Sequence, residues 1–263
     1  MTMHRIAELI SREKPDVIIA SGSFSKQLAN AAHSIGSKAL VYYHMITPWY
    51  VEIRGFYRRY KMLDLSMLYF GLSIALDKVL SADFSPLDYV DGLIVNSRYM
   101  AHIAERYWGI APFVLQPPIE IKNYVSLPRE NRSSQIVSVG RLDPDKHYED
   151  IIEVVGKSNT LRENIKIMLL GFMGNLRNLL TILRLAKSYD VKVVVETNAS
   201  EERKREALSS SMVFINSSRH EHFGINVVEA MASGTPVLAF NKGAIQEVVR
   251  HGVTGFLDPP SKN

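Results

Sequence analysis

The sequence predicts an α/β protein made of two doubly wound domains, each built on a parallel sheet. Short β-branched runs alternate with helical segments along most of its 263 residues. Alternation of this kind requires crossover connections, which bring the strands into parallel order. A polar stretch from residue 119 to residue 134 divides the alternation into two series. At roughly 150 residues per domain, the length accommodates two modest domains.

The first domain is expected to comprise residues 1–120. It begins with an amphipathic helix, and residues 16–20 then form a short apolar run that ends at Ser-Gly-Ser, a pattern typical of a buried parallel strand. The elements predicted after it are a helix over 26–35, strands over 39–43 and 91–95, and a helix over 100–107.

The least regular part of the sequence is residues 44–85. Its apolar run, residues 65–76, is shorter than the about 20 apolar residues that a membrane span needs. The run is interpreted either as a buried helix packed on the sheet or as a helix at an acceptor or membrane surface. Residues 49–61 mix basic and aromatic side chains, which can grip a lipid phosphate or anionic membrane, although a solvated helix face explains these charges equally well.

Residues 121–133 are predicted to link the domains, because their proline, asparagine and arginine content marks a change in composition. The second domain, residues 134–263, then repeats the alternation of strands and helices. Two Rossmann-like units are the simplest interpretation, since no short internal repeat is present. Strands are predicted over 135–139, 165–170, 191–196, 212–216 and 236–240.

Composition narrows the class of protein. The chain has no cysteine, which excludes disulfides, thiolate zinc sites and a cysteine nucleophile. A formal net charge of +4 favours anionic ligands or lipid surfaces, and no zinc-knuckle spacing or RNP-like aromatic pattern points to nucleic acid. The N-terminus lacks the basic start and apolar run of a signal peptide. We therefore expect a cytoplasmic protein, with peripheral contact at the inner membrane surface as an option.

Two carboxylates in the second domain have unusual settings. Glu221 follows a predicted strand, and Gly224 then opens a helix that carries Glu229 among apolar neighbours. Burying Glu229 there is costly unless a partner satisfies it, and a ribose diol offers two donors. The helix start at residues 223–226 supplies backbone amides and the positive end of a dipole, which suit a diphosphate. Taken alone, Glu221 could equally be a solvated loop acid.

Three residues at the start of the second domain suggest a phosphate site. Gly140, Arg141 and Lys146 lie between a predicted strand and a predicted helix. Two fixed cations beside a strand end can neutralise a phosphate that departs as a glycosidic bond breaks. Surface ion pairs explain both cations taken alone, but with Glu221 and Glu229 downstream a phosphate role is the better interpretation.

With these motifs the chain resembles the retaining family-4 glycosyltransferases of the GT-B fold, whose Glu-x7-Glu signature matches Glu221 and Glu229. The His-Phe-Gly-Ile sequence after Glu221 is similar to that of mannosyltransferases that extend lipid-linked oligosaccharides. The resemblance implies that Glu221 lies by the donor sugar and that Glu229 holds the ribose. It implies that Arg141 and Lys146 bind the donor diphosphate. The resemblance also places Gly140, Phe223, Gly224 and Ile225 in the donor site.

Two further parts of the chain fit this resemblance. His44, at the end of a predicted strand, matches a family histidine that approaches the donor sugar and the attacking hydroxyl; a histidine hydrogen-bonded within a loop is the alternative. Gly243 is expected to keep a loop near the nucleotide open. Glu247 has two equally weighted interpretations. It contributes to the loop near the nucleotide, or it caps or solvates a helix.

The implied function is retaining transfer of a hexosyl unit from a nucleoside-diphosphate sugar to a hydroxyl acceptor, which could be a lipid-linked or other glycan. Arg141, Lys146 and the helix start are expected to replace a metal, so no metal or other cofactor is predicted. The alternative is a non-catalytic sugar-nucleotide-binding or scaffold subunit. A glycosidase is disfavoured because its reaction does not require the phosphate-binding residues Arg141 and Lys146. A nicotinamide-dependent oxidoreductase is disfavoured because the glycines at 171 and 174 do not complete a Gly-x-Gly-x-x-Gly motif.

The ends of the sequence differ from the family pattern. The family begins with a strand and a glycine-rich loop, whereas this sequence begins with a helix and a strand that look like later elements. The family also continues with helices after the position of Asn263. We therefore expect residues from 134 onward to bind nucleotide, and transfer to need a partner or further elements.

Overall fold

The computed structural model describes residues 3–21, 26–44, 90–174 and 176–258. The apolar run at 65–76 and the basic aromatic residues at 49–61 lie outside these ranges. The chain divides into two compact units, residues 1–117 and 118–263. Both are α/β structures with entirely parallel sheets, as the alternation of elements predicts.

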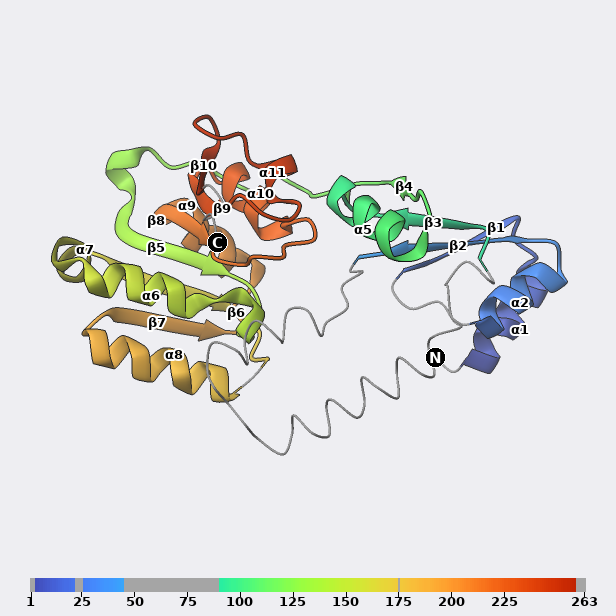
Figure 1. Cartoon of the computed structure of the whole chain (residues 1–263), viewed down its shortest axis with the longest axis horizontal. Helices are drawn as coiled ribbons and strands as arrows, with labels where there is room; N and C mark the ends of the chain where they lie inside the picture. The colour runs from blue at the N-terminus through green and yellow to red at the C-terminus, as the bar shows by residue number, and fades with distance from the viewer. Residues whose placement is uncertain (1–2, 22–25, 45–89, 175, 259–263) are drawn as a thin grey trace. The chain divides into compact units, whose positions relative to one another are not determined.

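The first unit contains a four-stranded sheet in the order β1-β2-β3-β4 (Figure 1). Its core forms where α2 and α5 pack on β2 and β3, with Ala32, Val41, Val95 and Met100 fully buried. Ser97 begins α5 by accepting a hydrogen bond from the Met100 amide, a usual helix cap. The elements are α1 (Met3–Glu13), β1 (Val17–Ser21), α2 (Lys26–Ser34), β2 (Lys38–Tyr43), β3 (Gly92–Val95), α5 (Arg98–Trp108) and β4 (Phe113–Val114).

The second unit contains a six-stranded sheet in the order β10-β9-β8-β5-β6-β7. The five strands predicted from the sequence are found within two residues of their expected ends. The strands are β5 (Ser133–Val139), β6 (Lys166–Gly171), β7 (Lys192–Thr197), β8 (Ser211–Asn216), β9 (Val237–Phe240) and β10 (Gly255–Asp258). The helices are η2 (Arg129–Asn131), η3 (Pro144–Lys146), α6 (Tyr148–Lys157), α7 (Asn159–Asn164), α8 (Leu176–Tyr189), α9 (Glu201–Ser210), α10 (Ile225–Ala232) and α11 (Ile245–Val248).

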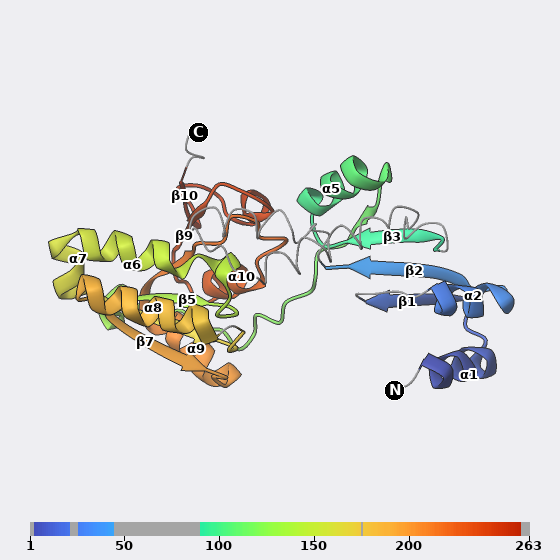
Figure 2. The same cartoon turned by 60° about the horizontal axis from the view of Figure 1, so that its bottom comes forward.

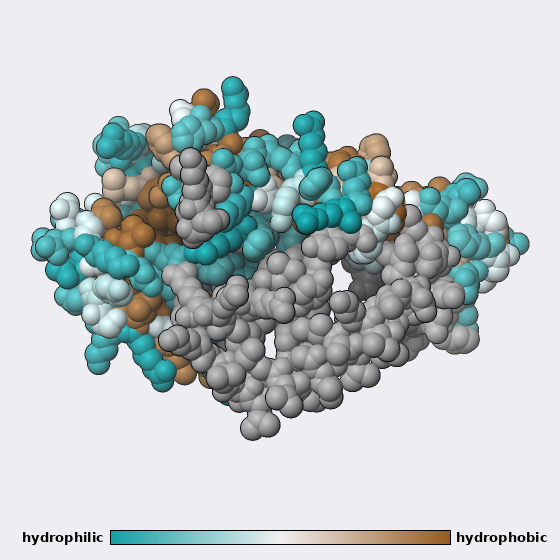
Figure 3. Space-filling view, viewed as in Figure 1, coloured by the Kyte–Doolittle hydropathy of each residue, from teal (hydrophilic) through white to brown (hydrophobic). Residues whose placement is uncertain are grey.

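Helices cover both faces of this sheet, as Figures 1 and 2 show. Alternate residues of a strand point to opposite faces. On β6, Ile167 and Leu169 pack in one core with α6 and α8. Met168 and Leu170 pack in the other core with α9 and α10. On the side shown in Figure 3, the surface of this unit is mixed, with hydrophobic patches among hydrophilic atoms.

The order of the strands creates a switch point in the middle of the sheet. From β5 the chain passes first to β6 on one side and later reaches β8 on the other. The loops after β5 and β8 therefore leave neighbouring strands in opposite directions. In open α/β sheets, ligands bind outside the carboxyl ends of the strands at such a point. The residues singled out in the sequence follow these two strands.

The segment from residue 121 to residue 133, predicted to be a linker, is grouped with the second unit. Arg132 holds it there, because its guanidinium donates hydrogen bonds to the carbonyl of Ser211 at 3.0 Å and to the hydroxyl of Thr235 at 2.6 Å. The same guanidinium reaches the carbonyls of Ser233 and Gly234. Arginine with five donors suits such a junction of carbonyl groups.

Candidate functional site

The candidate site of the second unit lies at the carboxyl ends of β5 and β8. Arg141 and Lys146 belong to the loop and 3₁₀ turn after β5, and Glu221 to the loop after β8. Gly224, the N-cap of α10, comes three residues after Glu221. Because β5 and β8 are neighbours in the sheet, these loops meet.

Lys146 and Glu221 form an ion pair at the centre of this region. The Lys146 amine lies 3.0 Å from a Glu221 carboxylate oxygen, and both side chains are mostly shielded, with 17% and 13% of their surfaces exposed. The same oxygen accepts a hydrogen bond from the Asn216 amide at 3.4 Å. Burial alone would raise the pKa of Glu221, but the charge and hydrogen bond of Lys146 outweigh it and lower that pKa. Glu221 is therefore ionised at neutral pH.

The backbone around Lys146 is also anchored. The Ser217 hydroxyl donates a hydrogen bond to the Lys146 carbonyl at 2.5 Å. Ser217 directly follows β8, so this bond ties the loop after β8 to the main chain of the loop after β5. It adds to the side-chain ion pair between the same two loops. The position of the lysine is thus set by several contacts rather than by one ion pair.

Arg141 occupies a more open position beside two aspartates. Its guanidinium lies 3.0 Å from Asp143 and 3.7 Å from Asp145, and its side chain is 58% exposed. The Asp143-Pro-Asp145 sequence is an Asp-x-Asp pair near a strand end, which the prediction of metal independence overlooked. An incoming diphosphate would compete with these carboxylates for Arg141, and with Glu221 for Lys146.

Glycines allow the loops of this region to approach closely. A Cβ atom at Gly140 would lie 2.9 Å from the Tyr148 hydroxyl, and one at Gly171 would lie 1.6 Å from the Gly140 carbonyl oxygen. Tyr148 is buried against this turn, and burial followed by the nearby charge of Asp145 raises its pKa. A larger residue at Gly171 would push the β5 and β6 loops apart, and one at Gly140 would displace the Tyr148 hydroxyl.

Gly224 opens α10, as the sequence predicts. It adopts a left-handed conformation with a φ of 90°, which favours glycine. The amides of Val227 and Val228 already donate to the Gly224 carbonyl, so an anion would be met by the amides before them. The Asn226 side chain donates to the carbonyl of Val139 at 2.5 Å and ties the helix start to the end of β5.

The flanking donor-site residues differ in exposure. Phe223 is buried, whereas Ile225 is half exposed and available to a ligand. Gly243 has a φ of 64°, and a Cβ there would lie 2.5 Å from the Glu221 carbonyl oxygen. The amide of Ala244 donates to that oxygen at 2.9 Å. Gly243 therefore supports the Glu221 loop by close backbone packing, and Glu247 lies in the first turn of α11.

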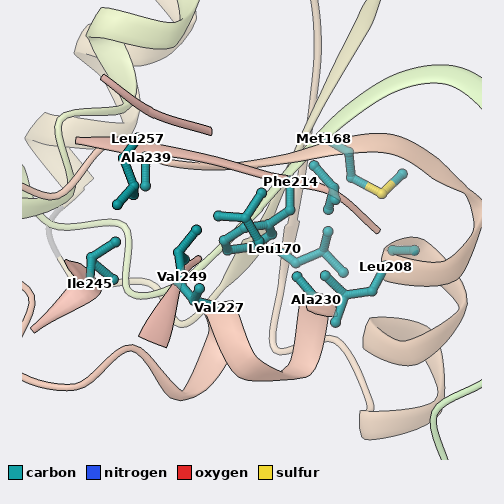
Figure 4. Packing of buried hydrophobic residues seen from close by; sticks show 13 residues of the cluster. Met168, Leu170, Leu208, Phe214, Val227, Ala230, Ala239, Ile245, Val249 and Leu257 are labelled. Atoms are coloured by element: carbon teal, nitrogen blue, oxygen red, sulfur yellow. The ribbon is translucent and has the colours of Figure 1, made fainter. Parts of the chain in front are cut away.

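Glu229 is buried on α10, and its partners come from the chain itself. The Lys204 amine lies 2.7 Å from its carboxylate and also 2.8 Å from Glu201. Burial and a hydrogen bond to Glu229 raise the pKa of Tyr124 to about 12. Neighbouring α10 residues Val227 and Ala230 belong to the core cluster of Figure 4. The sequence argument required a partner for Glu229 but did not identify Lys204 or Tyr124.

His44 directly follows β2 in the first unit. Its Nε2 atom lies 2.6 Å from the Ser21 hydroxyl, and its carbonyl accepts a hydrogen bond from the Asn96 amide at 2.9 Å. Its ring stands 4.5 Å from that of Tyr42. His44 is thus fixed at the carboxyl edge of a parallel sheet, where an α/β fold presents ligand groups.

Two histidines beside Glu221 resist protonation. Burial is the main cause, and it lowers the pKa of His222 to about 4 from the ordinary 6.5. The pKa of His220 is lowered by burial and then by the charges of Lys242 and Arg219. Both rings are neutral at physiological pH, so the cationic groups of the site are arginine and lysine.

The free energy of unfolding of the second unit is expected to fall as the pH drops from about 6.5 to about 4. In this window the unfolded chain binds protons on His222 that the folded chain does not, so acid favours unfolding. Urea denaturation at pH 7 and pH 5 measures the effect. His222→Gln should reduce the pH dependence, and an equally steep dependence in this variant would contradict the assignment.

In ranges 3–21, 26–44, 90–174 and 176–258, no cluster of three or more His, Asp and Glu side chains is arranged to hold a metal ion. Within the same ranges, no helix has the length and apolar character that crossing a bilayer requires.

Comparisons with known proteins show the family to which the chain is related. The family model Glycosyl transferases group 1 matches residues 122–263. The chain is 30% identical over 186 residues to the Xenopus laevis GDP-Man:Man(3)GlcNAc(2)-PP-Dol alpha-1,2-mannosyltransferase, covering 64% of this chain and 38% of that protein. It is 33% identical over 129 residues to a trehalose synthase of Pyrococcus horikoshii, covering 46% and 31%. The chain thus spans well under half the length of these relatives.

Solved structures resemble the chain over almost its whole length. A glycosyltransferase from Rickettsia africae has a TM-score of 0.71 at 16% identity, covering 98% of this chain and 66% of that one. Anabaena Alr3699/HepE, solved with UDP and glucose, has a TM-score of 0.70 at 18% identity, covering 98% and 67%. At these identities the likeness establishes the fold.

Proposed function

The chain belongs to the Glycosyl transferases group 1 family, with a GT-B-like fold as predicted, and from this premise we propose that it takes part in hexosyl transfer from a nucleoside-diphosphate sugar to a hydroxyl acceptor. One observation carries the proposal: Lys146 and Glu221 pair at 3.0 Å, at the switch point of the sheet and beside the start of α10. A cation, a carboxylate and a helix N-terminus then face one ligand position.

The donor diphosphate is proposed to bind Arg141, Lys146 and the amides at the start of α10. Arginine forms paired hydrogen bonds with phosphate oxygens, and lysine supplies a point charge. To bind in this way, the diphosphate exchanges places with the carboxylates of Asp143 and Glu221. Gly140 and Gly224 leave room for it, while Phe223 and Ile225 border the site.

The two glutamates are proposed to have separate roles. Glu229 accepts hydrogen bonds from the ribose hydroxyls, and the Lys204 amine, 2.7 Å from its carboxylate, holds the side chain in place. Glu221 lies by the donor sugar, where it positions a hydroxyl group or stabilises positive charge that develops at the anomeric carbon. His44 of the first unit is proposed to approach the same sugar from the acceptor side.

We propose a retaining reaction without a metal. The acceptor attacks on the face from which the phosphate departs, through an oxocarbenium-like state, and the departing phosphate helps to take the acceptor proton. The protein contributes by positioning the reactants and by neutralising phosphate charge. Arg141 and Lys146 supply the positive charge that a metal would otherwise provide.

The acceptor is proposed to be a glycan, with a lipid-linked glycan favoured by likeness to the Xenopus laevis mannosyltransferase whose name includes PP-Dol. A lipid-linked acceptor calls for peripheral contact with a membrane, which we place on its cytoplasmic side. The proposal specifies neither the base nor the sugar of the donor. The name of one relative includes GDP-Man, whereas a structural neighbour was solved with UDP. Nucleic acid is not among the proposed ligands.

The proposal is tested by incubating the whole chain with a panel of UDP, GDP and ADP sugars and lipid-pyrophosphate glycans. Transfer of a sugar with retained anomeric configuration is the expected result. Binding of a nucleotide sugar without transfer or hydrolysis under any condition would indicate a non-catalytic sugar-nucleotide-binding subunit instead. The absence of any nucleotide binding by the folded chain would overturn both.

Chelation is expected to leave nucleotide binding and transfer unchanged. EDTA removes divalent cations but leaves Arg141 and Lys146 in place, so the diphosphate keeps its counter-charges. Calorimetry and the transfer assay are run with and without EDTA. If EDTA abolishes both and Mg²⁺ or Mn²⁺ restores them, Asp143 and Asp145 become the first residues to substitute, since they form the Asp-x-Asp pair of this loop.

A further inference from the structure

Helix α8 carries an apolar stripe on its exposed side. Leu176, Leu180 and Leu183 follow at spacings of four and three residues, which places them on one face of the helix. Their side chains are 59%, 41% and 42% exposed. The opposite side of α8 already packs in the core through Ile182 and Ala186, so these leucines are not needed there.

Two more exposed apolar residues lie in the loop just before the helix. Phe172 and Met173 lie between β6 and α8 and are 68% and 50% exposed. Together the five side chains form a run of large apolar groups along one segment, whereas exposed apolar residues on a soluble surface are usually scattered. We name residues 172, 173, 176, 180 and 183 the α8 stripe.

The charged residues of helix α8 itself are all basic. Helix α8 contains Arg177, Arg184 and Lys187, all exposed, and has no acidic residue. Lys187 continues the line of leucines one turn after Leu183, and the two arginines lie beside that line at the next position along the helix. In Figure 3 hydrophobic and hydrophilic atoms adjoin at the lower left, where Figure 1 shows α8.

From this juxtaposition we propose that the α8 stripe and its three cations dock the protein on an anionic lipid surface. Leucine, phenylalanine and methionine side chains enter the boundary between headgroups and acyl chains, while arginine and lysine contact lipid phosphates. Charge complementarity selects this occupant. A symmetric contact with a second copy would bring the same three cations face to face, and like charges repel.

The position of the stripe connects it with the candidate site of the same unit. A Cβ atom at Gly174 would lie 1.9 Å from an Asp143 carboxylate oxygen, so the loop that begins the stripe packs directly on the loop of Arg141. Docking through α8 therefore brings the carboxyl edge of the sheet toward the lipid surface. The inference does not depend on the proposed reaction, because it rests on exposure and charge alone.

The test measures binding of the full chain to vesicles. Sedimentation is compared for vesicles of phosphatidylcholine alone and of phosphatidylcholine mixed with phosphatidylserine, and binding should require the anionic lipid. Neutralising two cations in Arg177→Gln/Arg184→Gln should weaken binding about thirtyfold, since each basic group near an anionic surface contributes about a fivefold effect. Leu180→Ser/Leu183→Ser should weaken it at least about tenfold by removing apolar insertion.

Controls separate this face from others. Val154→Ser/Arg250→Gln changes an exposed apolar and an exposed basic residue outside α8 and should bind vesicles like the unchanged chain. Thermal unfolding and nucleotide binding of all variants report on folding. Equal vesicle binding by all variants, or no binding of the folded chain to anionic vesicles, would overturn the proposal. So would a dimer that the leucine variant dissociates without any change in vesicle binding.

Discussion

Glu221→Ala is expected to lower sugar transfer about a hundredfold while nucleoside-diphosphate affinity stays the same or increases. Loss of one group that stabilises a transition state has an effect of this order. Affinity should not fall, because the substitution frees Lys146 from a carboxylate that lies 3.0 Å away and competes with phosphate. Calorimetry with UDP, GDP and ADP, combined with the transfer assay, measures the two quantities separately.

Lys146→Ala provides the matched comparison. It should weaken nucleoside-diphosphate binding about tenfold or more, since a hydrogen bond to a charged group is worth about 1.5–3 kcal/mol. The corresponding nucleosides, which lack phosphate, should lose little affinity. If Glu221→Ala instead abolished nucleotide binding together with transfer in a folded protein, Glu221 would be needed to assemble the site rather than to act on the sugar.

The pairing of Lys146 with Glu221 illustrates what the sequence does and does not predict. Both residues follow apolar runs that form neighbouring strands, so their approach at one sheet edge follows from topology. Their direct contact does not, because it depends on the path of two loops fixed by Ser217, Gly243 and other close contacts. The sequence therefore predicts the place of the site better than its charge arrangement.

The strands also differ in how well the sequence predicts them. The long apolar runs at β5 to β9 are predicted within two residues, because a buried parallel strand is continuously hydrophobic. The short strands β4 and β10, with two and four residues, were not predicted. Such segments carry little pattern of their own and are strands because β3 and β9 provide a hydrogen-bonding edge.

Lys204 shows why the partner of Glu229 could not be identified from the sequence. It stands in the charged run 201–206, which reads as a solvated helix face. A signal was present, since Lys204 precedes the buried residues Ala207 and Leu208 by three and four positions and so shares their helix face. Which acid it meets still depends on the packing of α9 against α10, two helices that no local pattern relates.

Glu229→Ala is expected to weaken nucleotide binding about tenfold or more, through loss of hydrogen bonds to the ribose. It should also destabilise the second unit, because Lys204 loses a partner at 2.7 Å in a largely buried position. The expected loss is about 1–3 kcal/mol, at the level of an unsatisfied buried group, since Glu201 still pairs with Lys204 at 2.8 Å. The two effects must be separated before the affinity change is attributed to the ligand.

The double variant Lys204→Met/Glu229→Leu separates them. Replacing both members of a buried ion pair by apolar residues of similar size is often neutral for stability, whereas removing one member is not. The double variant should therefore recover most of the free energy of unfolding lost in Glu229→Ala, as measured by urea denaturation. Nucleotide affinity should remain weak, because no carboxylate is left for the ribose. Recovery of affinity along with stability would mean that Glu229 supports the fold through Lys204 and does not contact the nucleotide.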